Sequence, residues 1–295
     1  MSVSQAESVP FQIVRTVAEL RAIVRDWRAD GRSVALVPTM GALHQGHLDL
    51  VREALRRADR VVTSVFVNPT QFAAHEDLGA YPRQQERDAE LLDQAGCALM
   101  FAPTVEEMYA PGAVTRVTVG EAETGGPAQG LEGDFRPQMF GGVALVVAKL
   151  LNQAQADVAV FGEKDWQQLM VVRRMARDLD IPTEIVGLQT VRDDHGLALS
   201  SRNAYLSADQ LQVAGRLNVI LREAADRAAA GRTLAAIEAD AVAALLKAGF
   251  DTVDYVAVRH ADSLATFASG VIEGPARILA AARIGRTRLI DNMAV

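Results

Sequence analysis

Short apolar runs alternate with segments of helical spacing along the first two-thirds of the chain. The runs at residues 34–37 and 61–67 stop at Pro38 and at Asn68-Pro69. Continuous apolar strands separated by helices are typical of a parallel sheet that is covered on both faces. The pattern predicts strands at residues 34–37, 61–67, 97–101, 157–161 and 184–186, with helices at about 47–58 and 84–95 and a further helix that ends near residue 180.

The last third of the chain has a different pattern. Ser207 and Gln210 have the spacing of a capping box and begin a long predicted helix that ends near Gly231. A second helix is expected from Thr233 to near Gly249, followed by strands at residues 253–258, 278–282 and 287–290. Helices followed by strands indicate a smaller α+β domain. We place the domain boundary near residue 190, and we expect the Gly-rich, acidic segment 120–133 to be a mobile surface loop.

Composition narrows the class of protein. Hydrophobic residues make up 49% and charged residues 23% of the 295 residues, as in an ordinary globular protein. The net charge of -7, without a long basic run, argues against a general binder of nucleic acid or membrane surfaces. Neither a signal peptide nor a membrane-spanning stretch is visible. The single cysteine, Cys97, excludes an internal disulfide and lies in an apolar run, so we expect a cytoplasmic protein in which Cys97 is a buried strand residue.

The strongest chemical signal is the segment Pro-Thr-Met-Gly-Ala-Leu-His-Gln-Gly-His-Leu at residues 38–48, which links the first predicted strand to a helix. A helix N-terminus favours phosphate, and Gly41 and Gly46 permit close approach of the backbone. His44 and His47 can share one face of the first helical turn and donate hydrogen bonds to the phosphates of a nucleotide. The alternatives are a turn with incidental histidines, and a zinc site, for which no suitable third ligand is present.

A second cluster, Phe-Gly-Glu-Lys-Asp-Trp-Gln-Gln at residues 161–168, also follows a predicted strand. Ligands bind at this edge of open α/β sheets. Lys164 can neutralise phosphate charge and Gln168 can bind a polar substrate. Asp165 also suits the N-terminus of a helix, so helix capping explains the cluster equally well.

Two further segments have weaker signals. The sequence Leu-Ser-Ser-Arg-Asn at residues 199–203 combines two hydroxyls with a guanidinium, which fits either a phosphate clamp or a polar linker. The sequence Asn-Pro-Thr-Gln-Phe at residues 68–72 offers the amides of Asn68 and Gln71 to a neutral polar ligand, but a simple turn explains it equally well.

Together, in this order and spacing, the four segments resemble the pantothenate synthetases, a family of the nucleotidyltransferases that carry a His-x-Gly-His motif. The resemblance covers nearly the whole chain and includes Tyr81-Pro82-Arg83, residues 131–133 with Arg136-Pro137, and residues 287–292. The His-x-Gly-His motif identifies only the superfamily. The Asn-Pro-x-Gln-Phe, Gly-Glu-Lys-Asp-x-Gln-Gln and Ser-Ser-Arg-Asn segments identify the family.

The resemblance implies an ATP-dependent ligase that works in two steps. ATP and pantoate give pantoyl adenylate and pyrophosphate, and the amine of β-alanine then attacks the acyl carbon to give pantothenate and AMP. Adenylation is chemically sensible because a free carboxylate has a poor leaving group, whereas AMP leaves readily. The implied fold is α/β, with a Rossmann-like doubly wound parallel sheet in residues 1–190 that binds nucleotide and pantoate, and a smaller α+β lid domain in residues 191–295. A homodimer is implied as well.

The resemblance also assigns site residues. The expected catalytic residues are His44, His47 and Lys164, with His47 as proton donor, and the expected substrate-binding residues are Asn68, Gln71 and Gln168. Magnesium is expected with the triphosphate, with Asp88 near the ion. The ATP site is expected to comprise Met40, Gly41, His44, Gly46, His47, Gly162, Glu163, Lys164, Asp165, Val191, Leu199, Ser200, Ser201 and Arg202.

Some positions depart from the family pattern. Gln138-Met139-Phe140 replaces the usual Gly-His-Phe, Leu145 replaces Ser or Thr, and His195 stands where Asp is common. None of these changes removes a phosphate-binding group, so the reaction class is unaffected.

Two other functions are compatible with the same motifs. One is another adenylyltransferase of the superfamily, although the amides of Gln71 and Gln168 favour a neutral or hydroxylated carboxylate over a phosphorylated acceptor. The other is a nucleotide-binding regulator without catalysis, against which the intact His44, His47 and Lys164 argue. An aminoacyl-tRNA synthetase is disfavoured by the small size and acidic charge.

Overall fold

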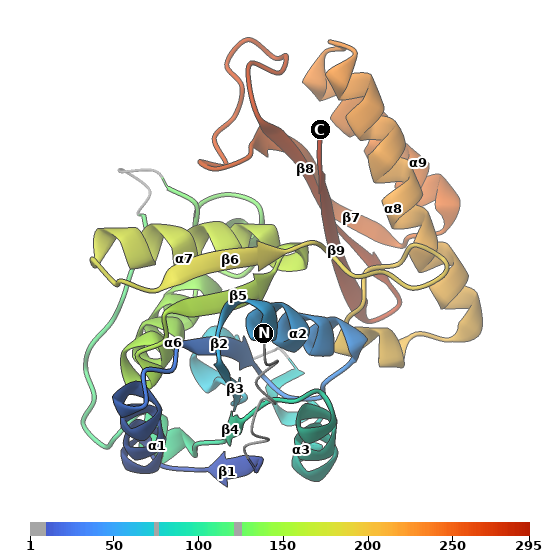
Figure 1. Ribbon diagram of the computed structural model, residues 1–295. Coiled ribbons are helices and arrows are strands. Elements are labelled where there is room, and N and C mark those ends of the chain that lie inside the picture. Colours follow the sequence, from blue (N-terminus) through green and yellow to red (C-terminus); the bar gives the residue numbers. More distant parts are fainter. Residues whose placement is uncertain (1–9, 74–76, 121–125) are drawn as a thin grey trace, which may run out of the picture.

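The structure, a computed structural model, describes residues 10–73, 77–120 and 126–295 (Figure 1). Its larger domain is built on a six-stranded sheet in which all neighbouring strands are parallel, in the order β1-β4-β3-β2-β5-β6. The strands are β1 (Gln12–Val14), β2 (Val34–Thr39), β3 (Arg60–Val65), β4 (Leu99–Phe101), β5 (Val158–Gly162) and β6 (Glu184–Leu188).

Helices cover both faces of this sheet. One apolar core packs α1, α6 and α7 against the sheet, and a second core packs α2 and α3 against the opposite face. The predicted α/β fold with a doubly wound parallel sheet is therefore confirmed. The helices of this domain are α1 (Val17–Ala29), α2 (Gln45–Arg57), α3 (Gln85–Gln94), α4 (Val105–Met108), α5 (Glu132–Phe135), α6 (Met139–Ala154) and α7 (Trp166–Asp178), with short 3-10 turns η1 (Pro69–Gln71), η2 (Asp77–Gly79) and η3 (Glu163–Asp165).

The strand order reverses at β2, which has β3 on one side and β5 on the other. Open α/β sheets bind ligands in the crevice outside the carboxyl ends of the strands at such a point. The chain leaves β2 into the His-x-Gly-His segment and leaves β5 into η3. The topology therefore brings the first two predicted clusters to one edge of the sheet.

The smaller domain follows η4 (Ser201–Tyr205) and consists of α8 (Ala208–Ala229), α9 (Leu234–Ala248) and the antiparallel sheet β7-β8-β9. Its strands are β7 (Thr252–His260), β8 (Ala276–Ile284) and β9 (Thr287–Ala294). The two helices pack on the sheet around an apolar core of their own (Figure 1). The predicted smaller α+β domain is confirmed, whereas its boundary at residue 190 stays a prediction.

Several local predictions can be compared with the structure. The Ser207 side chain accepts from the Gln210 N–H as a capping box requires. Cys97 is buried as predicted, but β4 begins at Leu99, so the prediction that Cys97 belongs to the strand is wrong. The predicted surface loop 120–133 is wrong at its end, because Leu131 and Glu132 are buried; residues 121–125 lie outside the described residues. β1 and α1 were not predicted. In the part of the chain that the structure describes, no helix is both long and apolar enough to cross a bilayer.

Candidate functional site

A cavity of about 260 Å³ lies where the carboxyl ends of β2, β5 and β6 meet strand β9 of the smaller domain. Its walls bring together all four clusters that the sequence singles out. The predicted residues that line it are Met40, His44, Gly46, His47, Asn68, Gln71, Gly162, Lys164, Asp165, Gln168, Val191, Leu199, Ser200, Ser201 and Arg202. Three other predicted residues, Gly41, Glu163 and Asp88, lie outside this lining.

The loop between β2 and α2 is shaped by a buried carboxylate. The two carboxylate oxygens of Asp88 accept the backbone N–H groups of Ala42 (2.9 Å) and Leu43 (2.8 Å). Gly41 has a φ of 83°, and a Cβ there would stand 2.9 Å from the Asp88 carboxylate, so this close approach requires glycine. Burial raises the pKa of Asp88, and the two N–H donors oppose that rise. The metal role predicted for Asp88 stays a prediction; its observed contacts hold the loop in place.

His44 and His47 stand at the start of α2 with ring centroids 4.0 Å apart. The backbone N–H of His44 donates to Nδ1 of His47 at 3.3 Å. An imidazole nitrogen that accepts a hydrogen bond carries no hydrogen, so the neutral ring of His47 has its hydrogen on Nε2. His47 therefore retains an Nε2–H donor at a helix N-terminus, where negative charge is favoured.

Both rings are neutral near pH 7. Burial, followed by the charges of His44 and Lys164, lowers the pKa of His47 to about 3. Burial, followed by the charge of Lys164, lowers the pKa of His44 to about 4. A neutral ring retains an N–H hydrogen-bond donor without adding a permanent charge beside Lys164. Transfer of a proton from His47, as the family resemblance implies, stays a prediction.

The lowered pKa of His47 predicts a pH-dependent stability. Between the ordinary value of 6.5 and about 3 the unfolded chain binds the proton that the folded ring rejects, so the free energy of unfolding falls as the pH falls. Removing this titration with His47→Asn is expected to flatten the slope by up to about 1.4 kcal/mol per pH unit. Denaturant unfolding at successive pH values in the upper part of this window measures the slope. Parallel slopes for the two proteins would contradict the depressed pKa.

Cationic and hydroxyl groups face the cavity from two other segments. Lys164 lies in η3, with its Nζ 3.7 Å from the Asp165 carboxylate. Ser200 caps η4 by accepting the Arg202 N–H at 3.3 Å, and the Ser201 hydroxyl lies 3.3 Å from the Tyr81 hydroxyl. These groups, together with the N-terminus of α2, are suited to hold a phosphate chain.

Amides line another part of the cavity. Asn68 is buried, and its Nδ2 donates to the Gln71 side-chain oxygen (3.1 Å) and to the Gly142 carbonyl (3.2 Å). The Gln71 Nε2 in turn lies 3.1 Å from the Met40 sulfur. Asn68 thus orients Gln71, whose side chain lines the cavity. Contact of either amide with a substrate stays a prediction.

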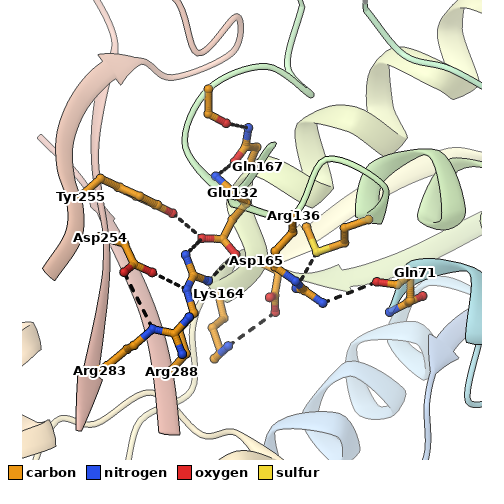
Figure 2. Close-up of polar contacts among 12 residues, drawn as sticks. Gln71, Glu132, Arg136, Lys164, Asp165, Gln167, Asp254, Tyr255, Arg283 and Arg288 are labelled. Carbon is orange, nitrogen blue, oxygen red and sulfur yellow. Dashed lines mark hydrogen bonds and ion pairs between the residues drawn. The ribbon is translucent and has the colours of Figure 1, made fainter. Parts of the chain in front are cut away.

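Sequence reasoning missed the buried network around Glu132 (Figure 2). The Glu132 carboxylate receives two hydrogen bonds from Arg288 of β9 (2.6 and 2.7 Å) and one from the Tyr255 hydroxyl of β7 (2.8 Å). Its backbone N–H donates to Gln167, whose amide donates to three carbonyls of residues 127–130. Burial works against the charge of Arg288, but its bonds to Glu132 and Asp254 raise its pKa. The network ties the wall of the cavity to the smaller domain.

In the sequence, this network is indicated only by residues 131–133 and 287–292, which belong to the segments that resemble the family. Neither segment indicated its partner, because 156 positions separate Glu132 from Arg288. The sequence likewise did not distinguish the role of Gln167 from that of the adjacent Gln168. Gln167 is buried and braces the loop, whereas Gln168 was predicted to bind substrate; both contribute to the cavity lining.

The chain is similar to known proteins over nearly its whole length. The model of the family described as pantoate-beta-alanine ligase matches residues 12–294. A pantothenate synthetase of Caulobacter vibrioides is 60% identical over 284 residues, which is 96% of this chain and 98% of that protein. The crystal structure of pantothenate synthetase from Thermus thermophilus has 46% identity and a TM-score of 0.87, covering 96% of this chain and 98% of that one.

A third similar protein was crystallised with ligands. Pantoate-beta-alanine ligase from Francisella tularensis, complexed with beta-gamma ATP and beta-alanine, has 30% identity and a TM-score of 0.80. The match covers 97% of this chain and 98% of that one.

Proposed function

The chain belongs to the pantoate–β-alanine ligase family, and on that basis we propose that it joins pantoate to β-alanine through a pantoyl adenylate, releasing pyrophosphate and then AMP. The observation that carries this proposal is the shared cavity. It combines Lys164 and the Ser200–Arg202 segment with a pair of neutral histidines, and it places the amides of Gln71 and Gln168 in the same lining.

The division of polar groups supports the order of the steps. In adenylation, the carboxylate oxygen of pantoate attacks the α-phosphorus of ATP and pyrophosphate leaves. Negative charge grows on phosphate oxygens during this step, and preorganised N–H and ammonium donors stabilise it. We assign this role to His44, His47 and Lys164, with Ser200, Ser201 and Arg202 on the other phosphates. Gln71 and Gln168 are assigned to the hydroxyls and carboxylate of pantoate.

The second step requires the amine of β-alanine to attack the acyl carbon, after which AMP departs. The Francisella relative, in complex with beta-gamma ATP and beta-alanine, supports both ligands for this family. For Mg²⁺ we propose binding through phosphate oxygens and water. Among the residues that the structure describes, no three His, Cys, Asp or Glu side chains are grouped to hold an ion, and both Asp88 oxygens already accept backbone N–H groups.

The same proposal covers the movement of the smaller domain, the oligomeric state and the place where the protein works. The division near residue 190 would let the smaller domain act as a lid that excludes water from a hydrolysable adenylate. We further propose a homodimer that works in the cytoplasm on small molecules alone, without nucleic acid or membrane.

The proposed order predicts exchange without the amine. Incubated with ATP, Mg²⁺ and pantoate, the protein should transfer label from pyrophosphate into ATP, because the cavity offers phosphate contacts and no covalent nucleophile is assigned. Omission of pantoate is the control and should abolish the exchange. Normal formation of pantothenate without any exchange would contradict a free adenylate and favour a concerted route.

A further inference from the structure

The turn that carries Lys164 is fastened from the other domain. Asn292 of β9 is 3% exposed, and its Nδ2 donates to the backbone carbonyls of Glu163 (2.9 Å) and Lys164 (2.8 Å). These two peptides are consecutive and form η3, where the chain passes from β5 into α7. One side-chain amide thus fixes the backbone on both sides of the Lys164 Cα atom.

The orientation of this amide is set by Arg277 of β8. The Arg277 Nε donates to the Asn292 side-chain oxygen, and its Nη2 lies 3.0 Å from the Glu163 carboxylate. A guanidinium can only donate and a carbonyl can only accept, so the Asn292 oxygen must face Arg277 and its nitrogen must face the turn. Arg277 also stacks over the Trp166 ring, with its central carbon 3.5 Å from the ring centroid.

The residue before Asn292 holds the other phosphate-facing segment. Asp291 is buried and accepts two hydrogen bonds from Arg192 (2.6 and 2.9 Å), which also donates to the Gly196 carbonyl. This fastens the stretch that leads into Ser200. Two consecutive residues of β9 therefore connect to the two segments that present Lys164 and the Ser200–Arg202 groups.

From these contacts we propose that Asn292 is a positioning residue for the ligation reaction: its amide fixes the η3 peptides so that Lys164 is directed at the phosphates of ATP. Asp291, through Arg192, holds the loop that leads into Ser200 in its position relative to this turn. The inference rests on the phosphate role proposed for Lys164. A long, flexible lysine stabilises a transition state only if its backbone origin is fixed, because a displacement of about 1 Å can cost on the order of 100-fold in rate.

The test compares pyrophosphate exchange in Asn292→Asp and the full-length wild type. Aspartate has the shape of asparagine and still offers an oxygen to Arg277. Its second oxygen, however, replaces the NH2 group that donates to the carbonyls of Glu163 and Lys164. We expect the exchange kcat to fall on the order of 100-fold, while KM for pantoate is unchanged, because the groups proposed to bind pantoate are the side chains of Gln71 and Gln168, whereas the Asn292 amide donates to the backbone of η3. Asn292→Ala removes the donor without adding charge and should have the same signature. Asn152→Asp is the matched control, because Asn152 also donates to a carbonyl (Ala148, 2.8 Å) but lies outside the cavity lining.

A double-mutant cycle with Lys164→Met separates positioning from general structural damage. If Asn292 acts through Lys164, the double variant is no slower than Lys164→Met alone. The inference would be overturned if the rate losses of the two single variants multiplied in the double variant. It would also be overturned if both Asn292 variants folded and exchanged pyrophosphate at the wild-type rate. Failure of the proposed function is distinct, because the wild type itself would then show no pantoate-dependent exchange.

Discussion

His47→Ala should slow adenylate formation on the order of 100-fold, equivalent to about 3 kcal/mol of transition-state stabilisation. Its Nδ1 accepts the His44 N–H, which leaves Nε2–H as the donor, and its low pKa keeps the ring neutral. Such a donor is held in place before charge develops on the phosphates. The second step attacks an acyl carbon and gains little from it, so supplied pantoyl adenylate should react with β-alanine at close to the normal rate.

Single-turnover measurement of the two half-reactions checks this separation. His195→Ala is the control, because His195 is exposed and lies outside the cavity lining; it should leave both rates unchanged. Equal loss of both half-reactions in folded His47→Ala would show that the histidine is not specific to adenylation. Loss of neither would leave the phosphate site to Lys164 and the Ser200–Arg202 segment.

Arg288→Met should lower the free energy of unfolding by about 3–5 kcal/mol, because it leaves the buried Glu132 carboxylate without its charged partner. The Arg288 guanidinium makes two hydrogen bonds to that carboxylate and a third to Asp254 (2.6 Å). The Tyr255 hydroxyl would remain as a neutral donor and cannot replace the charge. Urea unfolding of the variant and wild type measures the difference.

A matched surface pair provides the control. Arg227 and Asp240 also meet at 2.6 Å, but their side chains are 42% and 60% exposed. Arg227→Met should therefore cost no more than about 1 kcal/mol. Replacing both members of the buried pair, as in Glu132→Leu with Arg288→Met, should cost less than Arg288→Met alone, because the Glu132 carboxylate is then no longer buried without its partner. Equal costs for Arg288→Met and Arg227→Met would contradict the importance of burial for this pair.

The sequence predicted the parts of this molecule that depend on local patterns. Buried parallel strands are continuous apolar runs, so β2, β3 and β5 could be recognised along with the cluster that follows each. In contrast, β1 has only three residues, of which two are exposed. It belongs to the sheet because it pairs with β4, which lies far along the chain. Its place could not be inferred from its own residues.

The sequence also could not identify the residues that build the site through contacts with distant parts of the chain. Nothing in residues 287–292 shows that Asn292 reaches η3 or that Arg288 reaches Glu132, because these contacts arise only when two domains meet. Asp88 illustrates a different difficulty. An acidic residue in a helix is consistent with a metal neighbour, a solvated charge or a cap, and only its two hydrogen bonds to Ala42 and Leu43 reveal its structural contribution.

Release of AMP by the full-length protein, measured with ATP, Mg²⁺, pantoate and β-alanine and with each omitted in turn, tests whether this chain is the proposed ligase. We expect sustained AMP release, equal to the pantothenate formed, only in the complete mixture, since without β-alanine the adenylate remains bound and turnover stops. No AMP from the complete mixture would favour a nucleotide-binding protein without this catalysis. Release of AMP or pyrophosphate that does not depend on pantoate but requires a different acceptor would identify another adenylyltransferase. Either of these two results would contradict the proposed function.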